Sequence, residues 1–99
     1  MLIVRAKKLG FLESVAGLMF GFQKPPVYFE SRIGIHTFWV FYPIDVIILN
    51  RQGIVIKLVE SLKPNQILFL GFKSFVALEC KSCFIKDNKL KVGDKVIFV

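Results

Sequence analysis

The chain contains one His and two Cys, and it has no internal repeat, low-complexity tract or linker. It lacks the glycine-rich phosphate-loop and dinucleotide-binding fingerprints, which argues against an enzyme that uses nucleotides. A G-x-S-x-G elbow and a Cys-His signature are also absent, so nothing in the sequence indicates a nucleophilic hydrolase. These absences favour a non-catalytic binding or protein-interaction module, and no cofactor is expected.

Two stretches have the hydrophobicity of a signal peptide or a membrane span, but each carries an acid that argues against it. Residues 1–22 include Glu13 and are followed by no small-residue cleavage site. Residues 33–50 contain no Lys or Arg, yet Asp45 inside a span would cost about 3 kcal/mol. We therefore expect buried strands, no membrane span and a cytoplasmic location, where paired thiols are normally reduced.

The chain is unusually apolar for its size and carries an excess of positive charge. Apolar residues make up 55% of 99 residues, including eleven Phe, and a small domain lacks the interior volume to bury so many large side chains. This predicts a homodimer formed through an apolar aromatic patch, with scattered surface Phe as the alternative. The net charge of +7 favours anionic partners.

The pattern of apolar residues predicts one mainly β (α+β) domain over residues 1–99. Residues 11–20 have the spacing of one short amphipathic helix, with Gly21 at the position of a C-terminal cap. Short runs rich in Val, Ile and Phe, separated by turn residues, predict the strands. We expect a small partly closed β-barrel or sandwich with one short covering helix near the N-terminus. The expected strands are 2–5, 27–30, 35–42, 44–50, 53–61, 66–70, 74–79, 83–86 and 95–98.

The stretch at residues 35–48 is strongly apolar, yet it holds the only His and one of the seven acids. Pro43 cannot donate a hydrogen bond to a sheet, so it should separate two strands and leave Asp45 just beyond a kink. A carboxylate in such a place should accept backbone N–H groups or pair with a base, because unpaired burial is costly. We expect Asp45 to stabilise the kink by contacting the turn that contains Gly93 and Asp94, or Arg32.

His36 is the side chain in this stretch that could act near neutral pH. A core or interface imidazole bonded to the backbone is the simpler interpretation. With the aromatic side chains Trp39 and Tyr42 it forms a candidate ligand-binding group. A small enzyme that uses His36 and Asp45 is a weaker hypothesis, because it requires the two residues to converge beside an open pocket.

Three blocks of the sequence together resemble a known family. "GLMF" at 17–20, "ESRIGIHTFWVFYPIDVIILN" at 30–50 and "KVGDKVIF" at 91–98 are similar, in order and spacing, to the domain of unknown function 192 family, also called uncharacterised protein family 0127, in its archaeal intracellular type. The resemblance implies a compact, mainly β domain with a small helix and no established activity. The chain departs from the family pattern at Gly21, where Arg is common, and at "LECKSC" in residues 78–83.

Cys80 and Cys83 have the spacing that lets two thiolates share a metal or form a redox disulfide. A structural zinc needs four ligands, and His36 is the only other soft donor. Redox chemistry favours a pair at the start of a helix, whereas here the pair is expected to end a strand with no helix after it. An incidental thiol pair is therefore preferred over a structural disulfide or a metal or redox site.

A run of basic residues surrounds the expected last hairpin and offers a surface for nucleic acid or another polyanion. Phe84 and Phe98 lie close enough in sequence to act as stacking platforms for single strands. The alternative is that these lysines protect exposed strand edges from aggregation. The residues are Lys81, Lys86, Lys89, Lys91 and Lys95.

Overall fold

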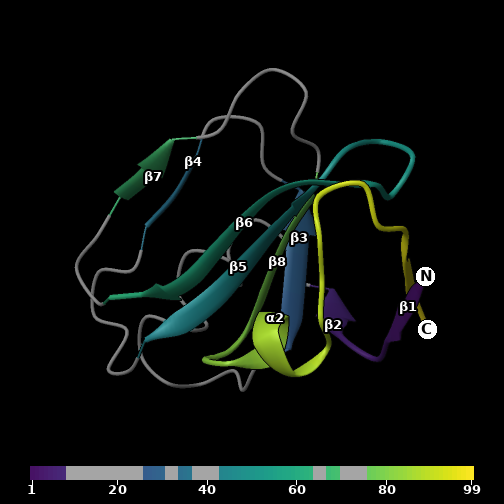
Figure 1. Cartoon of the computed structure of the whole chain (residues 1–99). Coiled ribbons are helices and arrows are strands. Elements are labelled where there is room, and N and C mark those ends of the chain that lie inside the picture. The colour runs from purple at the N-terminus through teal and green to yellow at the C-terminus, as the bar shows by residue number, and fades with distance from the viewer. Residues whose placement is uncertain (9–25, 31–33, 37–42, 64–66, 70–75) are drawn as a thin grey trace.

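The structure is a computed structural model that describes residues 1–8, 26–30, 34–36, 43–63, 67–69 and 76–99 (Figure 1). Short strands dominate it, as the sequence predicts, and one helical turn accompanies them. The strands are β1 (Leu2–Val4), β2 (Lys7–Lys8), β3 (Val27–Glu30), β4 (Gly34–His36), β5 (Ile44–Leu49), β6 (Val55–Leu62), β7 (Ile67–Phe69), β8 (Val76–Lys81) and β9 (Val96–Phe98), and the helix is α2 (Phe84–Asp87).

The centre of the fold is a five-stranded sheet in the order β2-β3-β8-β5-β6. Strands β3, β8, β5 and β6 pair antiparallel, and the short β2 joins β3 in parallel. Two smaller sheets accompany it: β1 pairs in parallel with β9, and β4 pairs antiparallel with β7. Since β5 lies between β6 and β8 and all its residues are buried, it forms the middle of the domain.

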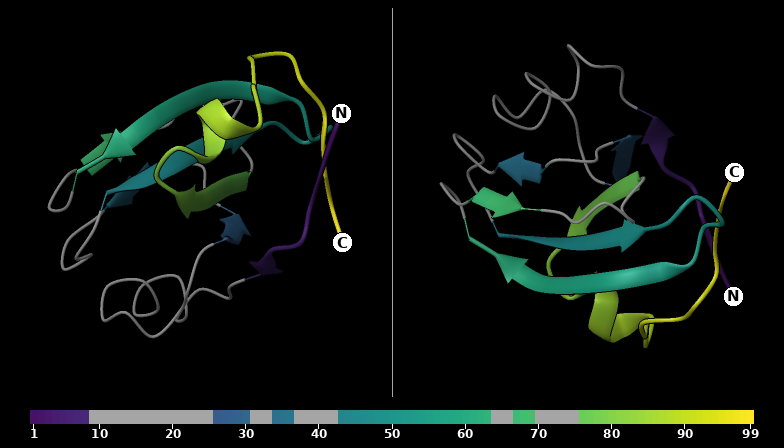
Figure 2. Two further views of the ribbon diagram at one scale, coloured as in Figure 1. Left: turned by 60° about the horizontal axis from the view of Figure 1, so that its bottom comes forward. Right: turned by 90° about the horizontal axis from the view of Figure 1, so that it is seen from above.

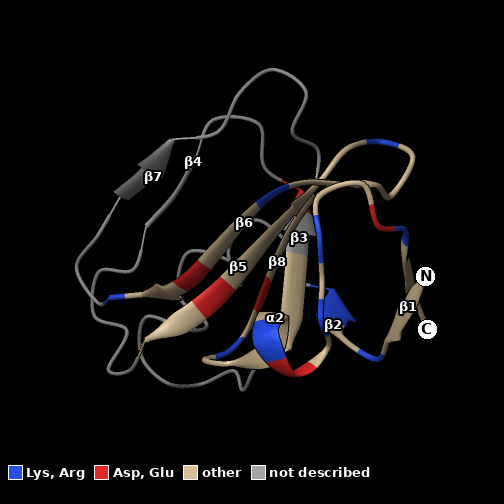
Figure 3. Cartoon of the chain, in the orientation of Figure 1, with Lys and Arg blue, Asp and Glu red and all other residues tan. Residues whose placement is uncertain are grey.

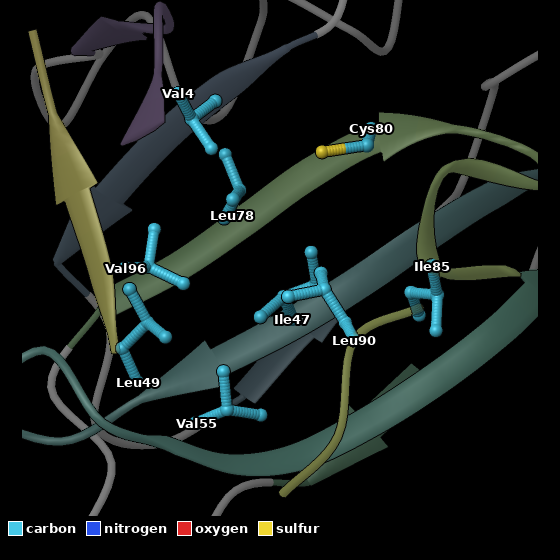
Figure 4. Close-up of a cluster of buried hydrophobic side chains, with 9 residues drawn as sticks. All are labelled: Val4, Ile47, Leu49, Val55, Leu78, Cys80, Ile85, Leu90 and Val96. Carbon is cyan, nitrogen blue, oxygen red and sulfur yellow. The ribbon is translucent and has the colours of Figure 1, made fainter. Parts of the chain in front are cut away.

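Both faces of the five-stranded sheet bury apolar side chains. On the face that α2 covers, Ile47, Leu49 and Leu78 pack with Ile85 of the helix and Val96 of β9 (Figure 4). The other face holds a second cluster, made by Val27, Ile44, Val46, Ile48 and Ala77. The β4–β7 pair lies on this second side, away from α2 (Figure 2, right). The residues of β5 are apolar on both faces of the strand, apart from Asp45, because the sheet is covered on both sides.

The strand expected at residues 83–86 is wrong, because Phe84–Asp87 form a helical turn. Strand β8 ends at Lys81, and Cys83 then adopts a left-handed conformation with φ 76° that turns the chain into α2. The C-terminal basic segment therefore does not form the expected hairpin, because it begins with α2 and its strand β9 pairs in parallel with β1. An extended reading of 83–86 failed because four residues are too few to show helical periodicity.

Three further expectations concern the overall architecture. The described strands form open sheets and do not close into a barrel. The helix expected over residues 11–20 lies outside the described residues. In the part of the chain that the structure describes, no helix has the length and apolar character needed to cross a membrane.

Candidate functional site

Asp45 is the second residue of β5, and its side chain lies on the α2-covered face and is fully buried. Its Oδ1 accepts a hydrogen bond from the backbone N–H of Ser61 at 2.8 Å, and its Oδ2 accepts one from the backbone N–H of Ile85 at 2.9 Å. One side chain thus connects β5 to β6 and to α2. Both oxygens are engaged with the backbone, which makes Asp45 a structural residue.

The N–H of Ser61 belongs to an irregular point in β6. Ile44 pairs with Leu62 and Val46 with Val59, so β6 contains an extra residue opposite Asp45, which is a β-bulge. Ser61 has a positive φ of 50° there, a conformation that few non-glycine residues adopt. Asp45 stabilises this conformation by accepting the Ser61 N–H, and the hydroxyls of Ser61 and Ser82 share a 2.5 Å hydrogen bond.

The N–H of Ile85 belongs to the first turn of α2, where backbone donors have no partner within the helix. Cys83 occupies the N-cap position but makes no side-chain capping bond. Asp45 caps the helix from a distant strand instead. The expected contact between Asp45 and the turn at Gly93 is therefore wrong, because the carboxylate accepts the N–H groups of Ser61 and Ile85. The other expected partner, Arg32, lies outside the described residues.

The turn at Gly93 and Asp94 is attached to β6 by its own bonds. The Gly93 N–H donates to the carbonyl of Val55 and the Val55 N–H donates to the carbonyl of Asp94, both at 2.8 Å. The Asp94 carboxylate accepts the Lys91 N–H at 2.9 Å. Gly93 has φ 99°, which favours glycine. Exposed Pro43 directly precedes β5.

Glu79 is a buried acid that the sequence reasoning missed. It is 4% exposed and lies on the sheet face away from α2, opposite Val27 and Val46. Burial raises its pKa from 4.5 to about 8, so the carboxyl is mostly protonated at neutral pH. Within the described ranges no hydrogen bond or ion pair to it is found. An acid inside the apolar run 76–80 was the available signal.

Cys80 and Cys83 are both free thiols in different surroundings. Cys80 is buried beside Leu78 and Ile85 (Figure 4), and Cys83 is exposed. Burial, and then the charges of Asp45 and Glu79, raise the pKa of Cys80 to about 12, so it stays protonated and unreactive. Although α2 does follow the pair, contrary to expectation, Cys80 therefore lacks the thiolate that redox chemistry requires.

Metal binding has no support in the described part of the molecule, where no three His, Cys, Asp or Glu side chains are grouped closely enough to hold an ion. His36 lies in β4, opposite Ile67. Its side chain, like Trp39 and Tyr42, falls outside what the structure describes. The candidate ligand-binding group of His36, Trp39 and Tyr42 thus stays a prediction.

The five lysines of residues 81–95, the lysine segment, are all exposed. Lys81 ends β8 and Lys86 lies on α2, and basic residues continue along the segment that leads to β9 (Figure 3). Lys89 has a positive φ of 53° in the turn after the helix. The Nζ of Lys95 donates a hydrogen bond to the carbonyl of Gln52, so this lysine also helps to hold the chain. The other four are not fixed by a side-chain bond that the structure records in its described part.

Comparison with known proteins identifies the fold and no family. No protein-family model matches the sequence, and no curated protein matches it. Two solved structures are similar, each over 94% of this chain with a TM-score of 0.74. One is a protein of unknown function from Novosphingobium aromaticivorans DSM 12444, with 19% identity over 71% of its length. The other is a putative transcription regulator from Sinorhizobium meliloti 1021, with 17% identity over 78% of its length.

Proposed function

We propose that the protein is a non-catalytic binding module whose lysine segment binds a polyanion, and that this polyanion is nucleic acid. The observation that carries the proposal is the exposure of all five lysines on one continuous segment. Phosphate groups along a nucleic acid backbone are matched by successive cations of this kind.

The segment keeps an excess of positive charge, because it holds two acids, Asp87 and Asp94, against its five lysines. The Asp94 carboxylate also accepts the Lys91 N–H within its own turn. Because Asp45 bonds to Ile85, the helix that carries Lys86 is fastened to the central sheet, so its charge is held in a defined place. One of the similar solved structures is that of a putative transcription regulator, which agrees with a nucleic-acid partner.

An enzyme that uses His36 and Asp45 has less support. Asp45 is fully buried and each of its oxygens accepts a backbone N–H group, so the carboxylate is out of reach of a substrate in solution. If Asp45 gave up these two bonds to act on a substrate, the bulge at Ser61 and the start of α2 would lose their acceptor. Binding therefore explains the described residues better than catalysis does.

The test is binding of a fluorescently labelled single-stranded oligonucleotide at increasing salt. We expect tight binding at low salt that weakens steadily as salt rises. Lys86→Gln with Lys91→Gln should lower the slope of log affinity against log salt by about two. The matched control, Lys8→Gln with Lys57→Gln, removes the same charge from β2 and β6 and should change the slope much less. No binding at low salt, or equal effects of the two double variants, would reject the proposal.

Several broader features belong to the same proposal. The resemblance to the domain of unknown function 192 family, the partly closed barrel or sandwich, and the cytoplasmic location are proposed on the sequence patterns that predict them. A homodimer through an aromatic patch is proposed as the second mode of binding. In the described residues the large exposed hydrophobic side chains are instead aliphatic, and they lead to a different surface.

A further inference from the structure

The two-stranded sheet of β1 and β9 buries one face and exposes the other. Val4 and Val96 point into the core, and Leu2 and Phe98 pack against it. Ile3 and Ile97 alternate with these residues and face outward. They are 59% and 39% exposed and lie directly side by side in the register of the two strands.

The same alternation extends this outward face by one residue pair at each end. The Leu2 N–H donates to the Lys95 carbonyl, and the Val99 N–H donates to the Val4 carbonyl, so the parallel pairing continues past the strand ends. Met1 and Val99, which are 81% and 67% exposed, therefore flank the two isoleucines. We call this surface the ribbon patch; its residues are Met1, Ile3, Arg5, Lys95, Ile97 and Val99.

The side chains of the ribbon patch are either aliphatic or basic. By register, Met1 lies beside Lys95 at one end, and Arg5 lies beside Val99 at the other. Both charged side chains are exposed, and the patch contains no acidic side chain. Contiguous exposed apolar surface usually marks an interaction site, and this one favours an occupant that brings negative charge.

A second copy of the chain fits this surface poorly. Face-to-face contact would gather two copies of Arg5 and of Lys95 in one interface between molecules that each carry a net charge of +7. A stable dimer also needs roughly 20 to 30 residues on each side, far more than this patch offers. Nucleic acid fits poorly as well, because aliphatic side chains offer bases no stacking platform.

We propose that the ribbon patch is a docking site for a short, extended acidic segment of a partner protein, which places aliphatic side chains on Ile3 and Ile97 and a carboxylate on Arg5. In an extended segment every second side chain faces the same way, which matches the two-residue spacing of Ile3 and Arg5 along β1. An interface of this size binds weakly and reversibly. The site is separate from the lysine segment except for Lys95, which is left unchanged in the tests.

The probe is a short synthetic peptide that alternates Glu and Ile, added to ¹⁵N-labelled protein and followed by NMR. We expect shifts in the amide signals of residues 1–5 and 95–99. Ile3→Ser with Ile97→Ser should weaken binding about tenfold, and both sites are exposed enough for the folded spectrum to persist. Val92→Ser is the matched control, because Val92 is 64% exposed but lies in the turn before β9.

Charge is tested separately with Arg5→Glu, which should abolish binding of the Glu-Ile peptide and create binding of a Lys-Ile peptide. The proposal would be overturned if the Glu-Ile peptide did not bind, or if it shifted only amide signals outside residues 1–5 and 95–99. Equal binding of the two peptides to the unchanged protein would also overturn it. So would binding to anionic lipid vesicles in place of the peptide, or a dimer that Ile3→Ser with Ile97→Ser dissociates. Because Lys86 and Lys91 are intact throughout, these outcomes are independent of the oligonucleotide test.

Discussion

Two buried carboxyl groups lie on opposite faces of the five-stranded sheet, on the neighbouring strands β5 and β8. Asp45 on β5 faces α2, and Glu79 on β8 lies opposite Val46, the residue after Asp45. Asp45 accepts two backbone N–H groups, whereas Glu79 has no bonding partner in the described part of the chain and its pKa is raised to about 8.

The difference shows that burial alone does not fix what an acid does. A carboxylate that meets backbone donors organises them, and Asp45 thereby holds a bulge and a helix start that the local sequence does not hold by itself. An acid that meets apolar neighbours takes up a proton instead, as Glu79 does. The first stabilises the fold, and the second makes stability depend on pH.

The largest effect is expected from Asp45→Ala. The substitution leaves the N–H groups of Ser61 and Ile85 without an acceptor, which should cost about 3 kcal/mol of unfolding free energy. Urea denaturation measures the loss. Asp45→Asn, which keeps one acceptor oxygen, should lose less, and Asp87→Ala on the exposed side of α2 should change almost nothing. If Asp45→Ala were as stable as Asp87→Ala, Asp45 would have no structural role.

Glu79 should give the protein a pH-dependent stability. Because the pKa is about 8 in the folded state and near 4.5 in the unfolded state, the folded state binds more protons between these values. Stability from this group is therefore complete below pH 4.5 and is lost as pH rises toward 8, by at most about 1.4 kcal/mol per pH unit.

Urea denaturation across this pH range checks the slope. Glu79→Gln cannot ionise and should remove much of it, while Glu60→Gln, an exposed acid on β6, should leave it intact. A slope that persists in Glu79→Gln would show that another group is responsible.

Ser82→Ala should have the smallest effect of the three. It removes the exposed hydroxyl contact with Ser61 but leaves the bond from the Ser61 N–H to Asp45, so the loss should be about 0.5 kcal/mol. Thermal unfolding beside the unchanged protein measures it. A loss as large as that of Asp45→Ala would mean that the hydroxyl pair, rather than the carboxylate, holds the bulge.

The sequence predicted the central strands well because their signals are local. Runs such as 44–50 are apolar and bounded by Pro43 and a turn, and β5 forms within them. The need of Asp45 for backbone donors also followed from its apolar surroundings. Its partners did not, because Ser61 and Ile85 are 16 and 40 residues away and meet it only through the bulge and α2.

The remaining errors have similar physical causes. Helix α2 begins at a left-handed Cys83 and is capped by a distant side chain, and neither feature appears in residues 83–86 themselves. The pairing of β1 with β9 joins the two ends of the chain, so the expected hairpin gave no hint of the exposed Ile3 and Ile97. Glu79 shared the pattern that drew attention to Asp45, an acid in an apolar run, and could have been found by it.

The contrast between the two acids is tested most directly by NMR titration of the side-chain carboxyl carbon of Glu79 in the folded protein. We expect a midpoint near pH 8, because Glu79 is buried among apolar side chains. A midpoint near 4.5 would contradict it, since Glu79 would then be stabilised as a carboxylate in the same way as an acid with bonding partners.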